Sequence, residues 1–215
     1  MSSNELTQRG FLTQASAAAA AVGLTARAAR GTPGANDRIS IGIIGLGVRG
    51  NAHIGLIQSA IKAKQNVAIR ALCDVWQPNL NAAVERVKKM SGETPETYTR
   101  YTDMLADKDI DAITIATPDF SHGTILVAAL KAGKDVYAEK PMTIQLSYAN
   151  EALDLARKNG RVVQCGTQYR SSPILRGVAR EVAAGTLGKI SRVTSAASFN
   201  AARWKKDVGD CKAAD

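Results

Sequence analysis

The fold of this chain is decided by the stretch Arg38-Ile39-Ser40-Ile41-Gly42-Ile43-Ile44-Gly45-Leu46-Gly47-Val48-Arg49-Gly50. A β-branched run breaks into glycines and continues as a helix-length segment, which predicts a strand, a tight turn and a helix. Gly45, Gly47 and Gly50 form a G-x-G-x-x-G pattern. Its first glycine makes the turn, its second lets the backbone approach a pyrophosphate, and its third lets helix and strand pack closely. The helix that follows would direct its free backbone N–H groups at the phosphates.

The sequence after the glycines favours a dinucleotide site over a flexible glycine loop that binds nothing. A second apolar run, residues 66–73, ends on Asp74. In such sites an acidic residue about 20 residues past the motif accepts hydrogen bonds from the adenosine ribose hydroxyls. Asp74 lies somewhat beyond that distance, at the expected strand end. A carboxylate there would also repel the 2′-phosphate of NADP. The pattern therefore predicts that NAD is the cofactor and that NADP is disfavoured.

Composition limits the class of protein further. The 215 residues, 45% hydrophobic and 22% charged, suit a globular protein with room for one domain and part of a second. No stretch is long and apolar enough to span a bilayer. The net charge of +9 could indicate nucleic acid, but the basic residues are scattered along helical segments and aromatic residues make up only 5%. We expect a basic face that favours an anionic cofactor, and no nucleic-acid partner.

Residues 1–35 differ in composition from the rest of the chain. A charged start, an alanine-rich centre and a small-residue cleavage site near Ala28 are typical of an export signal. The start resembles a twin-arginine signal, with Gln8 where the first arginine would stand. We therefore expect a periplasmic or exported protein, and a cytoplasmic one if this segment is instead a disordered tail.

Cysteine usage gives no disulfide framework, because the chain has three cysteines. Cys73 and Cys165 lie in apolar runs and are expected to be small buried residues. Cys211 lies in a polar segment without groups that would stabilise its thiolate. No cluster of residues has metal-ligand spacing, so no metal site is predicted.

Strands and helices alternate beyond Asp74, which predicts a doubly wound parallel sheet of the Rossmann α/β class, with ligands at the carboxyl ends of its strands. The expected helices are 77–90, 121–132 and 144–158, and the expected strands are 97–101, 110–116, 135–138 and 161–165.

Three later motifs carry a resemblance to a known family. Thr117, Pro118 and His122 form T-P-x-x-x-H, residues 132–141 read AGKDVYAEKP, and Gly166, Gln168 and Arg170 form G-x-Q-x-R. With the glycine loop, these motifs resemble the Gfo/Idh/MocA family of glucose-fructose oxidoreductases and inositol dehydrogenases, from residue 38 to the end of the chain. The resemblance implies NAD-dependent oxidation or reduction of a sugar or polyol hydroxyl.

The resemblance also implies roles for individual residues. Lys140 would be catalytic, lying between nicotinamide and substrate, where its neutral amine takes the hydroxyl proton. His122 would hold its loop rather than transfer a proton. Trp76 would either wall the adenine or pack in the protein. The implied cofactor contacts are Gly45, Gly47, Val48, Arg49, Gly50, Asp74, Thr117, Pro118, His122, Glu139 and Lys140.

The expected domains are an export signal and linker at 1–35, an NAD-binding Rossmann domain at 36–165, and the start of an open antiparallel-sheet α+β domain at 166–215. The last part would contain a helix at 170–184 and a strand at 188–199, and its sheet would allow a homo-oligomer. In the family this domain supplies substrate contacts that include a histidine, whereas no histidine follows His122 here. We therefore expect a truncated chain.

Two alternatives to a sugar or polyol oxidoreductase stay open. One is an NAD-dependent glycosidase of the α-N-acetylgalactosaminidase kind, in which transient oxidation eliminates the aglycone. The other is a fragment that binds NAD without turnover.

Overall fold

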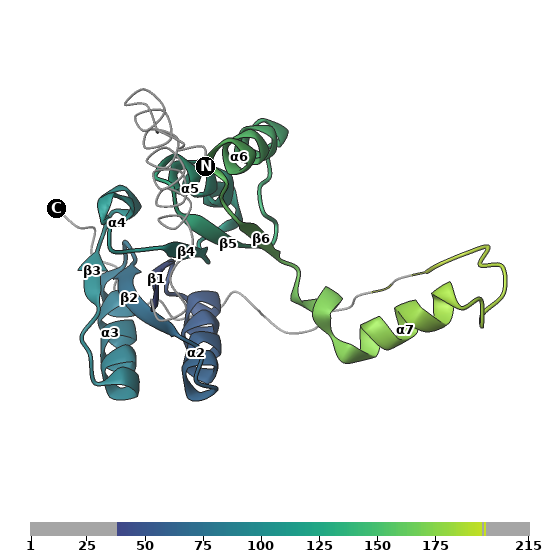
Figure 1. The fold of residues 1–215 in the computed structure, drawn as a ribbon, viewed down its shortest axis with the longest axis horizontal. Helices are drawn as coiled ribbons and strands as arrows, with labels where there is room; N and C mark the ends of the chain where they lie inside the picture. The colour runs from purple at the N-terminus through teal and green to yellow at the C-terminus, as the bar shows by residue number, and fades with distance from the viewer. Residues whose placement is uncertain (1–37, 195, 197–215) are drawn as a thin grey trace, which may run out of the picture. The chain divides into compact units, whose positions relative to one another are not determined.

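The computed structural model of the chain describes residues 38–194 and 196 (Figure 1). The predicted export signal and Cys211 lie outside the described residues. The chain divides into a first compact unit that ends at Thr167 and a second that begins at Gln168. The assignment of these parts to cofactor and substrate stays a prediction.

The first unit is built on one parallel sheet in the order β3-β2-β1-β4-β5-β6. The chain starts in the middle, moves outward to β3, and returns to β4 on the other side of β1. The predicted doubly wound Rossmann fold is therefore confirmed. The strands are β1 (Ile39–Ile44), β2 (Val67–Cys73), β3 (Glu96–Tyr98), β4 (Ala112–Ile115), β5 (Asp135–Glu139) and β6 (Val163–Gly166).

Helices cover both faces of this sheet (Figure 1). On one face α2 (Val48–Lys62) and α3 (Gln77–Ser91) enclose a core that includes Ile43, Ile54 and Leu72. On the other face α4 (Tyr101–Ala106), α5 (Asp119–Lys131) and α6 (Leu146–Asn159) enclose a second core with Ile113, Ile115 and Leu126. Successive strand residues point to opposite faces, so β1 and β2 supply side chains to both cores.

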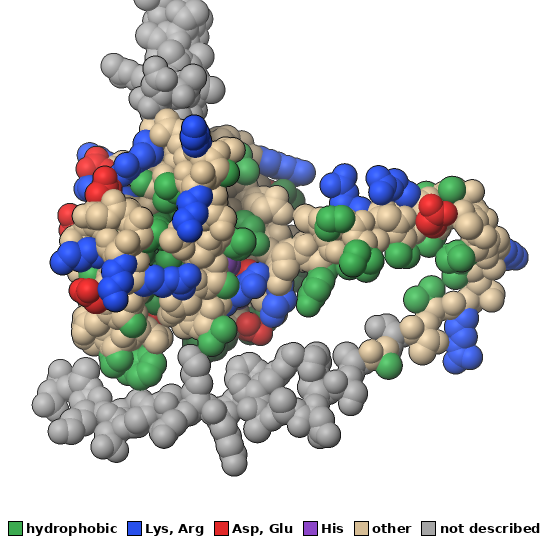
Figure 2. All heavy atoms as spheres, turned by 90° about the horizontal axis from the view of Figure 1, so that it is seen from below, with side chains coloured by type: hydrophobic (Ala, Val, Ile, Leu, Met, Phe, Trp, Pro, Cys, Tyr) green, Lys and Arg blue, Asp and Glu red, His purple; other side chains and the backbone are tan. Residues whose placement is uncertain are grey.

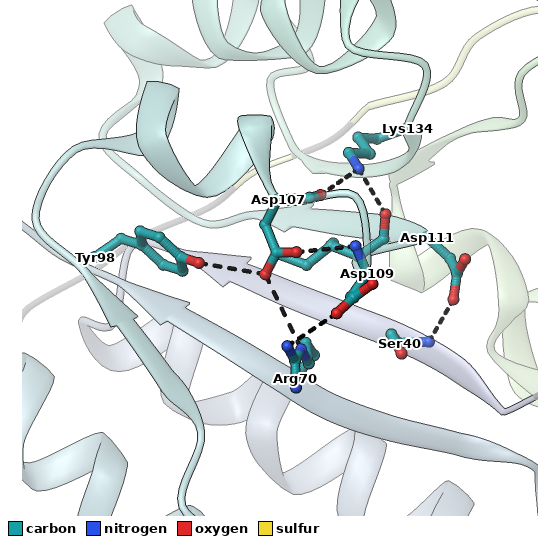
Figure 3. Close-up of polar contacts among 8 residues, drawn as sticks. Ser40, Arg70, Tyr98, Asp107, Asp109, Asp111 and Lys134 are labelled. Atoms are coloured by element: carbon teal, nitrogen blue, oxygen red, sulfur yellow. Dashed lines mark hydrogen bonds and ion pairs between the residues drawn. The ribbon is translucent and has the colours of Figure 1, made fainter.

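A polar network holds the loop between α4 and β4 (Figure 3). The buried Lys134 donates from Nζ to the carbonyl oxygens of Asp107 (2.6 Å) and Ile110 (2.8 Å). Asp111 accepts the backbone N–H of Ser40 at 2.8 Å, which joins this loop to the start of β1. Because the network lies at the amino ends of β1 and β4, its charged groups stabilise the sheet away from the glycine loop.

Two element predictions for the first unit are wrong in detail. Tyr101 was expected to end the third strand but begins α4, a short helix that the sequence analysis did not predict. β3 ends at Tyr98, and its three residues are the ones that pair with β2.

The second unit differs more from expectation. A 3-10 helix, η1 (Gln168–Ser171), precedes α7 (Pro173–Ala183), where one helix from Arg170 was predicted. The break has a physical cause, because the residue before a proline is disfavoured in helical conformation and proline suits the first helical turn. Figure 2 shows apolar side chains gathered along this helical segment. They include the exposed Ile174, Leu175, Val178 and Val182.

The strand predicted at 188–199 is wrong over its described part. Residues 188–194 and 196 form no strand. A strand is defined by backbone hydrogen bonds to a neighbour, and no described residue pairs with this segment. A homo-oligomer through such a sheet stays a prediction. Within the described ranges, no helix combines the length and apolar character needed to cross a membrane.

Candidate functional site

The glycine loop between β1 and α2 gives each glycine a different role. Gly45 has a left-handed φ of +87°, and a Cβ there would lie 2.7 Å from the backbone of Ala116. A Cβ on Gly50 would overlap the carbonyl oxygen of Gly45. A Cβ on Gly47 would meet nothing within 4 Å. The outer glycines are therefore required by the fold, whereas Gly47 leaves an open space in front of the loop.

The start of α2 faces that space with its backbone donors. Gly47 is the N-cap and has no side chain that could cap the first N–H groups of α2, and the first turn holds no acidic side chain. The first N–H groups of a helix lack partners within the helix and carry the positive end of its dipole. Val48, in this turn, is exposed. This combination suits a bound phosphate, and the space at Gly47 fits one.

Asp74 lies at the carboxyl end of β2 and is tied to the glycine loop. Its Oδ2 accepts the N–H of Leu46 at 2.7 Å, and its Oδ1 accepts the N–H of Trp76 at 2.8 Å. Oδ2 also accepts Asn79 Nδ2 at 3.5 Å, whereas Oδ1 has a second lone pair that a ribose hydroxyl could use. The half-buried Trp76 lies next to this carboxylate.

Thr117, Pro118 and His122 lie where β4 turns into α5. Pro118 is the N-cap of α5. The ring of His122 is buried, with Nε2 2.8 Å from the Thr117 carbonyl oxygen and Nδ1 2.6 Å from the Pro141 carbonyl oxygen. His122 therefore joins this turn to the segment after β5.

Glu139, the last residue of β5, has a buried carboxylate that bonds to α2. Its Oε1 accepts Arg49 Nε at 2.6 Å and lies 3.1 Å from His53 Nε2, and its Oε2 accepts the N–H of Lys140 at 3.2 Å. Burial raises the pKa of Glu139, but the bonds from His53, Arg49 and Lys140 lower that pKa more, so it lies below its usual value. Burial lowers the pKa of His53, despite the neighbouring carboxylate. The stable pair is therefore an ionised Glu139 beside a neutral His53.

Lys140 follows directly, with an exposed side chain and a cis peptide bond to Pro141. The other predicted cofactor residues of the first unit lie at the same edge, where β1, β2, β4 and β5 end. His53 is the residue at this edge that the sequence analysis missed. Its signal was its position three residues after Gly50, one helical turn along the face of α2 that packs on the sheet.

The described cysteines have no role in cofactor binding that their surroundings support. Burial raises the pKa of the Cys73 thiol to about 12, which makes it an unreactive core residue. Cys165 is half-buried and free. In the described part of the chain, no group of three His, Cys, Asp or Glu residues is placed to hold a metal ion.

An all-parallel sheet of this strand order, with a glycine loop at the switch point between β1 and β4, defines a Rossmann-type dinucleotide-binding domain. The family model described as "Oxidoreductase family, NAD-binding Rossmann fold" matches residues 39–167. The chain belongs to this family, the Gfo/Idh/MocA oxidoreductases.

The chain is similar to curated relatives and to solved structures. The inositol 2-dehydrogenase of Salmonella typhimurium is 30% identical over 133 residues, which cover 61% of this chain and 38% of that protein. A glycosyl hydrolase family 109 protein of Shewanella baltica is 27% identical over 183 residues, which cover 82% of this chain and 38% of that protein. The structure is similar to that of scyllo-inositol dehydrogenase from Lactobacillus casei with bound NAD(H) and scyllo-inositol. That comparison gives a TM-score of 0.62 and 29% identity, and covers 71% of this chain and 43% of that one. The chain thus spans less than half the length of these relatives.

Proposed function

We propose that this chain is the nucleotide-binding part of an oxidoreductase that acts on a hydroxyl group of a sugar or polyol, with NAD as cofactor. The observation that carries the proposal is the open space at Gly47. It faces an uncapped helix start at the same sheet edge as Asp74 and Lys140. Membership of an NAD-binding family supports it.

The binding roles follow from charge and shape. The backbone at Gly47 and in the first turn of α2 would hold the pyrophosphate. The Asp74 carboxylate would accept hydrogen bonds from the adenosine ribose and oppose a 2′-phosphate by charge repulsion. Thr117 and Pro118 would flank the nicotinamide side.

NAD, when bound, supplies a hydride acceptor for the carbon that bears the substrate hydroxyl. A neutral Lys140 amine would take the hydroxyl proton while the C–H hydrogen leaves as hydride for that acceptor, so that the carbonyl forms. Because the Lys140 side chain is exposed, its proton can pass to solvent. Arg49 and Glu139 lie beside this segment but form an ion pair with each other.

The catalytic role is tested by single-turnover assays with excess protein, NAD and myo-inositol, scyllo-inositol or glucose. NADH formation is followed by fluorescence. We expect Lys140→Ala to abolish any NADH formed, whereas Lys158→Ala, at the exposed end of α6, leaves it unchanged. Equal NADH formation by Lys140→Ala would contradict the assignment. If the chain binds NAD but forms no NADH with any substrate, the fragment without turnover is favoured.

An NAD-dependent glycosidase is the second candidate. The observation that favours it is the longer match to the glycosyl hydrolase family 109 protein, which covers 82% of this chain. Such an enzyme would release the aglycone from an N-acetylgalactosaminide without net formation of NADH. Product release that requires NAD but accumulates no NADH would distinguish it from the oxidoreductase.

We also propose that residues 1–35 direct export, on the strength of their sequence alone. Periplasmic protein should then begin near Ala29. N-terminal sequencing that finds only uncleaved protein in the cytoplasm would contradict export.

A further inference from the structure

Both histidines of the chain contact the segment around Lys140. We propose that His53 and His122 are positioning residues that hold Lys140 from its two sides. His53 acts through the carboxylate of Glu139, and His122 acts through the carbonyl of Pro141. The proposal rests on the proposed function, because it takes Lys140 as the residue at the nicotinamide.

Lys140 needs such support because its own side chain has no fixed partner. The side chain is exposed, and within the described residues only its backbone N–H makes a hydrogen bond. A lysine side chain has four flexible carbons, so without a side-chain partner its backbone is the part that neighbouring residues can hold. Reacting groups must be placed to within about 0.5 Å, so a movable backbone here would cost rate.

On the amino side, the carboxylate of Glu139 is enclosed, with 3% of the residue exposed. Arg49 and His53 both bond to it from α2, the helix that begins at the glycine loop. The same carboxylate accepts the Lys140 N–H. If phosphate binding shifts α2, these bonds would pass the displacement on to the backbone of Lys140.

Two further groups enclose the Glu139 carboxylate, namely β6 and the ring of Tyr137. A Cβ on Gly166 would lie 3.0 Å from Glu139 Oε1 and 3.0 Å from the Tyr137 hydroxyl, so glycine leaves room for both. The Tyr137 ring meets the His53 ring edge-on, with centroids 5.3 Å apart. His53 therefore has little freedom to turn away from the carboxylate.

The protonation states fit this role. An ionised carboxylate only accepts hydrogen bonds, so a neutral His53 carries its hydrogen on Nε2 and donates to Glu139. Its Nδ1 is then an acceptor, and it has no partner among the described residues. Among the polar groups of the described residues, Glu139 is therefore the one that orients the His53 ring.

On the carboxyl side, His122 is 1% exposed and lies between two carbonyl oxygens. Nδ1 faces Pro141 and Nε2 faces Thr117. A carbonyl oxygen only accepts, so a ring nitrogen that carries a hydrogen donates to the carbonyl it faces. Proline has no N–H, so its carbonyl is the backbone polar group through which Pro141 can be fixed.

The two ring nitrogens of His122 can be tested separately. An asparagine amide replaces the Nδ1 position, and a glutamine amide replaces the Nε2 position. If the Pro141 contact positions Lys140, His122→Asn keeps the function and His122→Gln loses it. Glu139→Gln removes the charge that holds Arg49 and His53, and it should act like His122→Gln. Glu93→Gln, in the exposed pair with Arg38, is the matched control.

The readout is a pair of affinities, measured by calorimetry for NAD and for ADP-ribose, which lacks the nicotinamide. We expect His122→Gln and Glu139→Gln to weaken NAD binding about tenfold and to leave ADP-ribose binding nearly unchanged. His122→Asn and the control should stay near the unmodified protein. NAD should also protect the Lys140 amine from reductive methylation, read by mass spectrometry, and this protection should be lost in the same two variants.

Equal weakening for NAD and ADP-ribose, or equal behaviour of His122→Asn and His122→Gln, would overturn the proposal, because either indicates a merely structural role. If a buried variant does not fold, Arg49→Lys carries the test at a half-exposed position. It keeps the charge but loses the Nε donor, and it should weaken NAD binding alone. Failure of the proposed function would look different, because the unmodified protein would then bind neither ligand.

Discussion

At the scale of single residues, the glycine loop separates what the fold needs from what a ligand needs. Gly50 lies against the Gly45 carbonyl, whereas Gly47 borders open space. The motif predicts this division of roles, and the structure gives the contacts from which the effect of each glycine on stability can be estimated.

The first prediction uses this contrast. Gly47→Ala should fold, with a loss of at most about 1 kcal/mol for the poorer N-cap. It should weaken NAD binding because its methyl group occupies the phosphate position. Gly50→Ala should lose about 2 kcal/mol or more of unfolding free energy, because its methyl group overlaps backbone. Urea unfolding and NAD titration measure both. The assignment would be reversed if Gly47→Ala failed to fold while Gly50→Ala folded and bound NAD normally.

The second prediction concerns Asp74, whose carboxylate has one task in the structure and a second in the proposed function. It holds the N–H groups of Leu46 and Trp76, and it places a negative charge beside the expected ribose. Asp74→Ser should therefore weaken NAD binding and narrow or reverse the preference for NAD over NADP. Calorimetry with both cofactors gives the ratio. An unchanged ratio would mean that the carboxylate is only structural.

At the scale of elements, the strands of the first unit other than β3 were predicted well because they are short, largely apolar runs bounded by turn residues. The phosphate-loop motif and Lys140 also carry strong local patterns. What could not be predicted depends on contacts distant in sequence. The bonds of Glu139 to Arg49 and His53 join residues 90 and 86 positions apart. The short helix α4 has only six residues, too few to show a helical repeat of apolar positions, so the packing of Met104 and Leu105 decides it.

The third prediction tests the loop between α4 and β4. Lys134→Met keeps the buried chain length but leaves two carbonyl oxygens without their charged donor. We expect a loss of roughly 2 kcal/mol in unfolding free energy. Lys131→Met, in an exposed pair with Glu151, is the control and should change stability by about 1 kcal/mol or less. Equal losses of unfolding free energy in the two variants would show that the buried position of Lys134 adds no stability beyond that of an exposed lysine.

At the scale of the whole molecule, stability should fall as the solution becomes acidic. The pKa of His53 is below its usual 6.5, so the unfolded chain takes up this proton first and stability declines as pH falls below about 6.5. The pKa of Glu139 is below its usual 4.5, so its contribution is present above about pH 4.5 and is lost as pH falls further.

The fourth prediction follows from these signs. Urea unfolding across a pH series should show that His53→Gln flattens the first decline and that Glu139→Gln flattens the second. Stability of the unmodified protein that rises as pH falls from 7 to 6 would contradict a neutral, buried His53.

We propose that the carboxyl edge of the first unit binds NAD. Calorimetric titration of the chain with NAD, and separately with NADP, measures this binding. We expect saturable binding of one NAD per chain, with NAD bound more tightly than NADP. Absence of NAD binding by folded protein, or equal affinity for the two cofactors, would contradict it.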